Sequence, residues 1–172
     1  EKRGHTSQKG GVGASGFVSK LDSAGNVIWT RQMGLNANRR TASVSVDSSG
    51  NVFVAGNFIG TGDFAPGPGT VNLTAIGSND IFLSKLDNSG SLQWVKHIGG
   101  SGTEWVYSMV IDSDGAIYTA GTFEGTVDFD PNAGTANLTS SWWAAFMSKL
   151  DNAGNFVWAK RVGGGGAVNA KS

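Results

Sequence analysis

A repeat of about 65 residues runs through the chain and constrains its fold more than any other feature. Phe17, Phe82 and Phe146 stand near the start of three related segments that contain Ser-Lys-Leu-Asp, and they lie 65 and 64 residues apart. A second segment begins at Ser43 and returns at Ser108, again 65 residues later. A period of this length indicates tandem supersecondary units that bury their apolar faces against one another.

Each unit contains two copies of the pattern Asp-x-x-Gly, flanked by β-branched and aromatic residues that alternate with small polar ones. The aspartate is expected to cap a type I turn, and the glycine to supply the positive φ that closes a bulged hairpin. Two hairpins per unit predict four antiparallel strands. The capping aspartates are Asp22, Asp47, Asp87, Asp112 and Asp151.

The predicted fold class is all-β, a β-propeller segment built from tandem four-stranded antiparallel blades of about 65 residues. The 27 glycines of the chain fit many short strands joined by tight turns. Trp29, Trp94 and Trp158 occupy one position of the repeat. Because an isolated four-stranded sheet leaves both faces wet, these indoles require blades that stack face to face.

The repeat period predicts how the chain is divided. An irregular segment, 1–15, is expected to precede an outer half-blade, 16–34, and two complete blades, 35–99 and 100–163. Residues 164–172 are expected to begin a further blade or to form a tail. Since closed propellers typically have four to eight blades, either the chain belongs to a longer polypeptide or several copies assemble. We favour the longer polypeptide.

The composition excludes several classes of function. Lysine plus arginine equals aspartate plus glutamate at 13 each, so no overall charge favours nucleic acid or an anionic membrane. No apolar run approaches the roughly 20 residues of a membrane-spanning helix. Cysteine is absent, which removes disulfides, thiolate metal sites and cysteine nucleophiles. We therefore expect neither nucleic acid as a partner nor direct membrane insertion.

The chain offers little material for catalysis. It has two histidines, His5 and His97, and no cluster that breaks the repeat supplies a nucleophile with an oriented base. His97 stands where the other repeats have Gln32 and Arg161, so it is expected to face solvent. We predict no catalytic residues and no enzymatic activity.

Calcium is the metal for which the sequence offers ligands, and no other cofactor is expected. Asp128 and Asp130 could provide two hard oxygen ligands. The other repeat has Ala65 in place of Asp130, however, so turn capping by aspartate explains these residues as well. Both interpretations stay open.

Trp142 and Trp143 replace Ser78 and Asn79 at the entry to the third strand of a unit. Adjacent strand residues point to opposite faces, so one indole is expected at a surface. An exposed tryptophan suits sugar stacking or a protein-binding hot spot, whereas packing against a neighbouring blade is the alternative.

Several elements of the repeat match a known type. They are the turns 47–51 and 151–155, the strand from Val52, the segment 125–131, and the Phe-x-Ser-Lys-Leu-Asp and Trp-x-Lys-x-Ile-Gly-Gly strands. With these elements the chain resembles the bacterial β-propeller repeat family often called the SBBP (seven-bladed β-propeller) type. The resemblance covers roughly residues 16–164, and the number seven is not carried over to this chain. It implies a propeller within a long secreted or surface protein of bacteria, without catalytic residues.

The expected function is that of a secreted or cell-surface scaffold, structural or adhesive, for protein–protein interaction. Its expected partners are further blades of the same or identical chains, and a protein or glycan at the bacterial surface. A carbohydrate-binding propeller that uses Trp142 or Trp143 is the alternative. A propeller-type lyase or hydrolase is a third reading, which the apolar and serine-rich inner strands disfavour.

Overall fold

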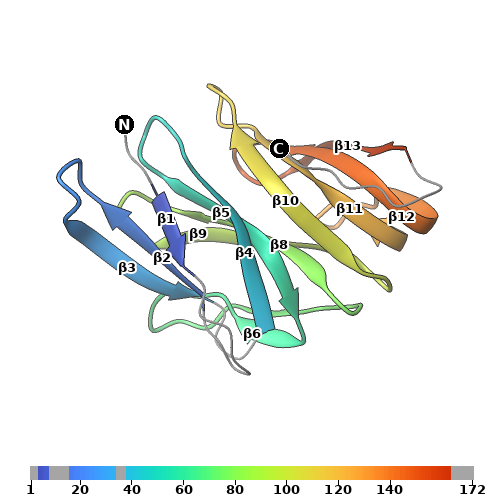
Figure 1. Ribbon diagram of the computed structural model, residues 1–172, viewed down its shortest axis with the longest axis horizontal. Helices are drawn as coiled ribbons and strands as arrows, with labels where there is room; N and C mark the ends of the chain where they lie inside the picture. The colour runs from blue at the N-terminus through green and yellow to red at the C-terminus, as the bar shows by residue number, and fades with distance from the viewer. Residues whose placement is uncertain (1–3, 8–15, 34–37, 164–172) are drawn as a thin grey trace.

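The computed structural model describes residues 4–7, 16–33 and 38–163, and it consists of antiparallel strands (Figure 1). The all-β class is therefore confirmed. Three groups of strands lie side by side along the long axis in chain order (Figure 1). Within the described residues no helix is long and apolar enough to cross a membrane.

The first group is a three-stranded sheet, here called the N-terminal sheet. It contains β1 (Gly4–Ser7), β2 (Gly16–Leu21) and β3 (Val27–Met33) in that order. The segment 1–15, expected to be irregular, thus includes a strand, which pairs with β2 from Gly4↔Lys20 to Ser7↔Phe17. The rest of that segment and the expected start of a further blade at 164–172 lie outside the described residues.

The central sheet contains, in spatial order, β4 (Asn38–Val46), β5 (Val52–Ile59), β8 (Asp80–Leu86) and β9 (Leu92–Gly100). The C-terminal sheet contains β10 (Glu104–Ile111), β11 (Ile117–Asp128), β12 (Asn137–Leu150) and β13 (Phe156–Val162), paired in sequence order. Two short pairings between β11 and β9, Val127↔Gly100 and Asp128↔Gly99, join them into one eight-stranded sheet.

The Asp-x-x-Gly turns have the geometry that the sequence predicts. In the turn after β2, Asp22 Oδ1 accepts the backbone N–H groups of Ala24 and Asn26 at 2.9 and 2.8 Å. Gly25 has a φ of 87°, which residues with a Cβ rarely adopt. The hydrogen bond from the Asn26 side chain, with those from the backbone, holds the pKa of Asp22 below its ordinary value. The hairpin prediction is confirmed.

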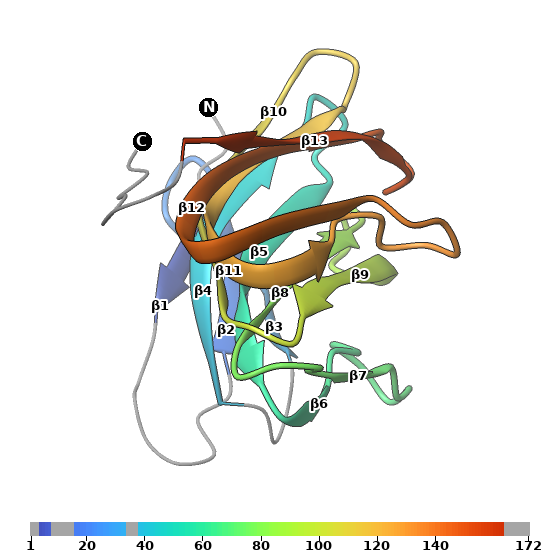
Figure 2. The ribbon, with the colours of Figure 1, turned by 90° about the vertical axis from the view of Figure 1, so that its right-hand side faces the viewer.

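In each of the two four-stranded sheets, the connection between the second and third strands forms a projecting arm. In the central sheet this first arm is a separate hairpin, β6 (Thr61–Asp63) and β7 (Asn72–Thr74). Figure 2 shows it set apart from the other strands at the lower edge of the molecule. In the C-terminal sheet the second arm, residues 126–139, continues β11 and β12 without a break in the strands.

The apolar core lies between the sheets. One cluster joins Val18, Trp29 and Met33 of the N-terminal sheet to Phe58 and Phe82 of the central sheet. The second joins the opposite side of the central sheet to the C-terminal sheet, with Phe53, Leu83, Val106, Phe123 and Phe146 among its members. The sheets therefore bury their aromatic residues by packing face to face, as the tryptophan positions require.

Candidate functional site: the junction between the central and C-terminal sheets

A buried polar cluster lies where the chain passes from the central sheet to the C-terminal sheet. Asp80 begins β8 and Glu104 begins β10, and both have 0% exposed area. Asp80 Oδ2 accepts the backbone N–H of Ile76 at 2.8 Å and lies 2.5 Å from His97 Nε2. None of the three polar residues recurs in the repeat: their counterparts are Ala144 for Asp80, Arg39 for Glu104, and Gln32 and Arg161 for His97.

The Glu104 carboxyl is held without full hydrogen bonding. Its Oε2 accepts the backbone N–H of Gly100 at 3.2 Å, while its buried Oε1 has no partner among the described protein atoms. Burial, together with the negative charge of Asp80, raises the pKa of Glu104 to about 8. At neutral pH Glu104 is thus mostly protonated.

Two asparagines attach the start of β10 to the central sheet. Asn57 Nδ2 and Asn79 Nδ2 donate to the Glu104 carbonyl oxygen at 2.9 and 2.5 Å. The Asn57 Oδ1 accepts the Val106 N–H at 3.3 Å. The Glu104 N–H also donates to the Asn79 carbonyl oxygen at 2.8 Å, so side-chain and backbone hydrogen bonds together hold the start of β10 against the central sheet.

Glycines make this close approach sterically feasible. A Cβ on Gly99 would lie 2.2 Å from Asp80 Oδ2, and one on Gly77 would lie 2.3 Å from the Gly102 carbonyl oxygen. Both distances are far inside van der Waals contact, so the junction requires glycine at these positions. Because both carboxyl groups are fully buried, the geometry assigns the cluster to sheet docking.

The expectation that His97 faces solvent is wrong. Its side chain is 21% exposed, and it pairs with Asp80 and packs edge-on against Phe58 at 5.4 Å between ring centroids. Asp80 is absent from the equivalent positions of the other repeats, so alignment of His97 with Gln32 and Arg161 could not reveal the pair.

A second set of contacts recurs between successive sheets, and sequence reasoning missed it. The lysine of Ser-Lys-Leu-Asp reaches the next sheet and donates to the asparagine that follows the capping aspartate there. Lys20 Nζ donates to Asn88 Oδ1, and Lys85 Nζ donates to Asn152 Oδ1. Each lysine also approaches the carbonyl oxygen of that asparagine at 3.4 Å. The signal was present in the sequence, because both residue types follow the 65-residue period.

A groove of about 610 Å³ lies between the N-terminal sheet and the first arm. Arg31 lines it together with the segment 65–69 and the turn around Gly90. In the second arm the equivalent of Gly67 is Asn132, whose Oδ1 accepts a hydrogen bond from Lys96 Nζ at 2.6 Å. Arg31, the equivalent of Lys96, donates directly to the Gly90 carbonyl oxygen at 2.9 Å. Gly67 has no side chain to accept a hydrogen bond, and the long arginine side chain reaches the turn around Gly90 without it.

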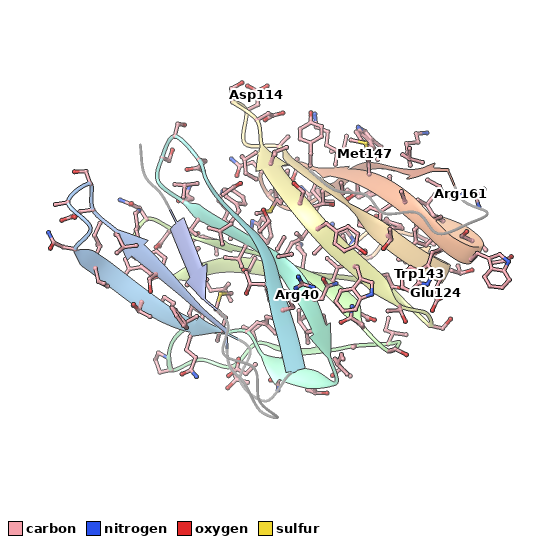
Figure 3. The ribbon with its side chains drawn as sticks, in the orientation of Figure 1. Arg40, Asp114, Glu124, Trp143, Met147 and Arg161 are labelled. Carbon is pink, nitrogen blue, oxygen red and sulfur yellow. The ribbon has the colours of Figure 1, made fainter. Side chains whose placement is uncertain are left out.

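The two tryptophans predicted as a binding site differ in exposure. Trp142 on β12 is 71% exposed, whereas its neighbour Trp143 is half-buried. Trp143 lies beside Glu124 at the end of the C-terminal sheet (Figure 3), where β11 and β12 shift register. Of the two indoles, that of Trp142 is therefore the one exposed at the surface.

The two aspartates proposed for calcium close the second arm. Asp128 Oδ1 accepts the backbone N–H groups of Asp130 and Ala136 at 3.0 and 2.8 Å. Asp130 Oδ1 accepts the N–H of Asn132 at 3.0 Å. In the part of the chain that the structure describes, no group of three or more His, Asp or Glu residues could hold a metal ion. Calcium binding stays a prediction.

We expect Asp128→Ala to lower the free energy of unfolding by about 1–2 kcal/mol, because two backbone N–H groups lose their acceptor. Urea denaturation in calcium and in EDTA should give the same loss. Asp63→Ala is the matched variant, since Asp63 accepts the N–H groups of Ala65 and Val71 in the first arm. A calcium site would instead appear as calcium-dependent stability that Asp128→Ala and Asp130→Ala both abolish.

No family model matches the chain. It is similar to the regulatory protein FlaEY of Caulobacter vibrioides, with 29% identity over 140 residues that cover 79% of this chain and 14% of that protein. It is also similar to the uncharacterized WD repeat-containing protein L264 of Acanthamoeba polyphaga mimivirus, with 28% identity over 114 residues that cover 56% of this chain and 8% of that protein. The chain therefore corresponds to a small part of the length of each relative.

Proposed function

We propose that the chain is a segment of a β-propeller of the SBBP type, a secreted or cell-surface scaffold without enzymatic activity that presents a binding surface to a protein partner. The observation that carries this proposal is that one mode of sheet packing occurs twice. Val18 and Trp29 pack against the central sheet, and their repeat equivalents, Leu83 and Trp94, pack against the C-terminal sheet. A constant relation between successive four-stranded sheets is the basis of propeller architecture.

The first strands of the sheets support the same proposal. Ser43 on β4 exchanges hydrogen bonds with Met109 on β10: its Oγ donates to the Met109 carbonyl oxygen and accepts the Met109 N–H, each at 3.3 Å. In a propeller the first strand of every blade lines the central channel. Contacts between β4 and β10 therefore fit adjacent blades that converge on one axis.

The relatives support the β-propeller fold in general. WD repeats form four-stranded blades, and one relative is described as a WD repeat-containing protein. Both relatives are far longer than the matched segment. We propose that further blades, from the same polypeptide or from identical chains, complete the ring.

Trp142 is the proposed contact residue for the partner. An exposed indole provides a large rigid apolar surface at low entropic cost, which is why tryptophan is enriched in binding hot spots. We expect Trp142→Ala to reduce binding at least tenfold on protein and glycan arrays and to leave the urea midpoint unchanged. Ile76→Ala is a matched control, because Ile76 is 69% exposed and belongs to the central sheet's connection.

The array results separate the candidate functions. Protein ligands lost in Trp142→Ala favour the scaffold. Glycan ligands lost in the same variant favour a carbohydrate-binding propeller, the second candidate that the exposed indole supports. If Trp142→Ala and the control Ile76→Ala bind the same ligands equally well, Trp142 is not the contact residue. An absence of ligands on both arrays would contradict a binding role.

A further inference from the structure

The lysine contacts between successive sheets indicate how a further sheet would dock, an inference that rests on the tandem arrangement proposed above. The turn that joins β2 to β3, β8 to β9 and β12 to β13 is here called the outer turn of its sheet. Lys20 contacts Asn88 in the outer turn of the central sheet, and Lys85 contacts Asn152 in the outer turn of the C-terminal sheet. Two successive junctions thus use the same donor and the same acceptor.

Lys149 occupies the third equivalent position. The Lys149 ammonium lies 4.8 Å from the ring centroid of Tyr118, as the Lys85 ammonium lies 5.1 Å from that of Phe53. Its nearest carboxylate is that of Asp112 in its own sheet, at 4.0 Å. Lys149 therefore has the orientation of Lys85, and an asparagine from a following sheet would complete the same contact.

The surface around Lys149 is an apolar sheet face that the described residues leave uncovered. Met147 is 44% exposed and Val162 is 51% exposed. Their equivalents in the central sheet, Leu83 and Ile98, are each 1% exposed because the C-terminal sheet covers them. Met147 lies on the C-terminal sheet, the group of strands farthest from the N-terminal sheet (Figure 3). In the central sheet, the equivalent face is covered by the next sheet along the chain.

We propose that this face receives a further four-stranded sheet whose outer turn carries asparagine directly after its capping aspartate, and that Lys149 selects that asparagine. A second copy of this chain fits less well. Its first outer turn has Ser23 after Asp22, so its N-terminal sheet lacks the amide oxygen. The occupant is a repeat unit with an Asp-Asn-x-Gly outer turn.

The test extends the full chain after Ser172 with a copy of residues 109–163, which keeps the repeat in phase and supplies an outer turn with asparagine. The readout is the rate at which peroxide oxidises Met147. Met33 and Met109 are 3% and 4% exposed and serve as internal controls. The appended copy carries Met147→Leu, so that the signal comes from the original side chain.

We expect the extension to slow oxidation of Met147 at least tenfold. Asn152→Ser in the appended copy, or Lys149→Leu in the original sheet, should each raise the oxidation rate of Met147 about tenfold above that of the extended chain, because a charge-assisted hydrogen bond is lost. The two changes together should have little more effect than either one, since they remove the same contact.

Each contrary result points to a different failure. Equal protection with asparagine and serine overturns selection by Lys149 and leaves the tandem proposal intact. An appended sheet that gives no protection overturns docking of a further sheet and, with it, the proposed propeller. Concentration-dependent protection of Met147 in the unextended chain would identify a second copy as the occupant and overturn the inference.

Discussion

Glu104→Gln should stabilise the protein at alkaline pH and remove most of a pH dependence that the wild type shows between about pH 4.5 and 8. The pKa of Glu104 is raised from 4.5 to about 8 in the folded protein. Between these values the folded state holds a proton that the unfolded state has released. The stability of the wild type therefore falls as pH rises, by about 1.4 kcal/mol per pH unit, or roughly 5 kcal/mol over the whole interval.

Glutamine has the shape of the protonated acid and cannot ionise, so the variant keeps the docking geometry without this loss. Urea unfolding at pH 5, 6, 7, 8 and 9 would measure the slopes of both proteins. Glu124→Gln is the control, because Glu124 contributes only a minor charge effect on Glu104. Equal slopes for wild type and Glu104→Gln would show that Glu104 ionises normally in the folded state.

Asp80→Asn provides an independent check on the same cluster. The charge of Asp80 is the second cause of the raised pKa of Glu104, after burial. Removing that charge should lower the pKa of Glu104 in the folded protein, so the pH-dependent interval should end at a lower pH. The variant also weakens the contacts of Asp80 with Ile76 and His97, so its overall stability should fall while its slope near pH 8 flattens.

The sequence predicted the features that depend on local rules. The aspartate caps and positive-φ glycines follow from turn chemistry, and the strand class follows from alternation. Both recur at a fixed period, so each copy supports the others. The face-to-face packing of the sheets also followed, because three tryptophans at one repeat position have no other way to be buried.

The junction cluster could not be predicted, because its residues depart from the repeat at distant positions. Asp80, His97 and Glu104 come from three strands, and each looks like an ordinary polar surface residue in its own segment. Pairing of β8 with β9 brings Asp80 and His97 together, and the packing of β10 on the central sheet adds Glu104. The lysine–asparagine contacts are different: their periodicity was visible, but the partner of each lysine depends on how successive sheets stack.

Phe53→Ala should lower the free energy of unfolding by about 3–5 kcal/mol, the usual cost of emptying a large aromatic site in a core. Phe53 is 0% exposed, and the C-terminal sheet covers it. Tyr118 is the matched position, because it has the same neighbours within its own sheet. Phe53 contacts Trp94 at 6.1 Å between ring centroids, and Tyr118 contacts Trp158 at 6.3 Å.

The two positions differ in what lies above them, so the comparison isolates the contribution of sheet-on-sheet burial. Tyr118 is only partly buried, and we expect Tyr118→Ala to cost about 1 kcal/mol in urea unfolding. Similar losses for the two variants would mean that contacts within one sheet stabilise these rings, and that a single unit does not need its neighbour. In the chain extended by a further sheet, Tyr118→Ala should become as costly as Phe53→Ala, because the appended sheet would cover Tyr118 as the C-terminal sheet covers Phe53.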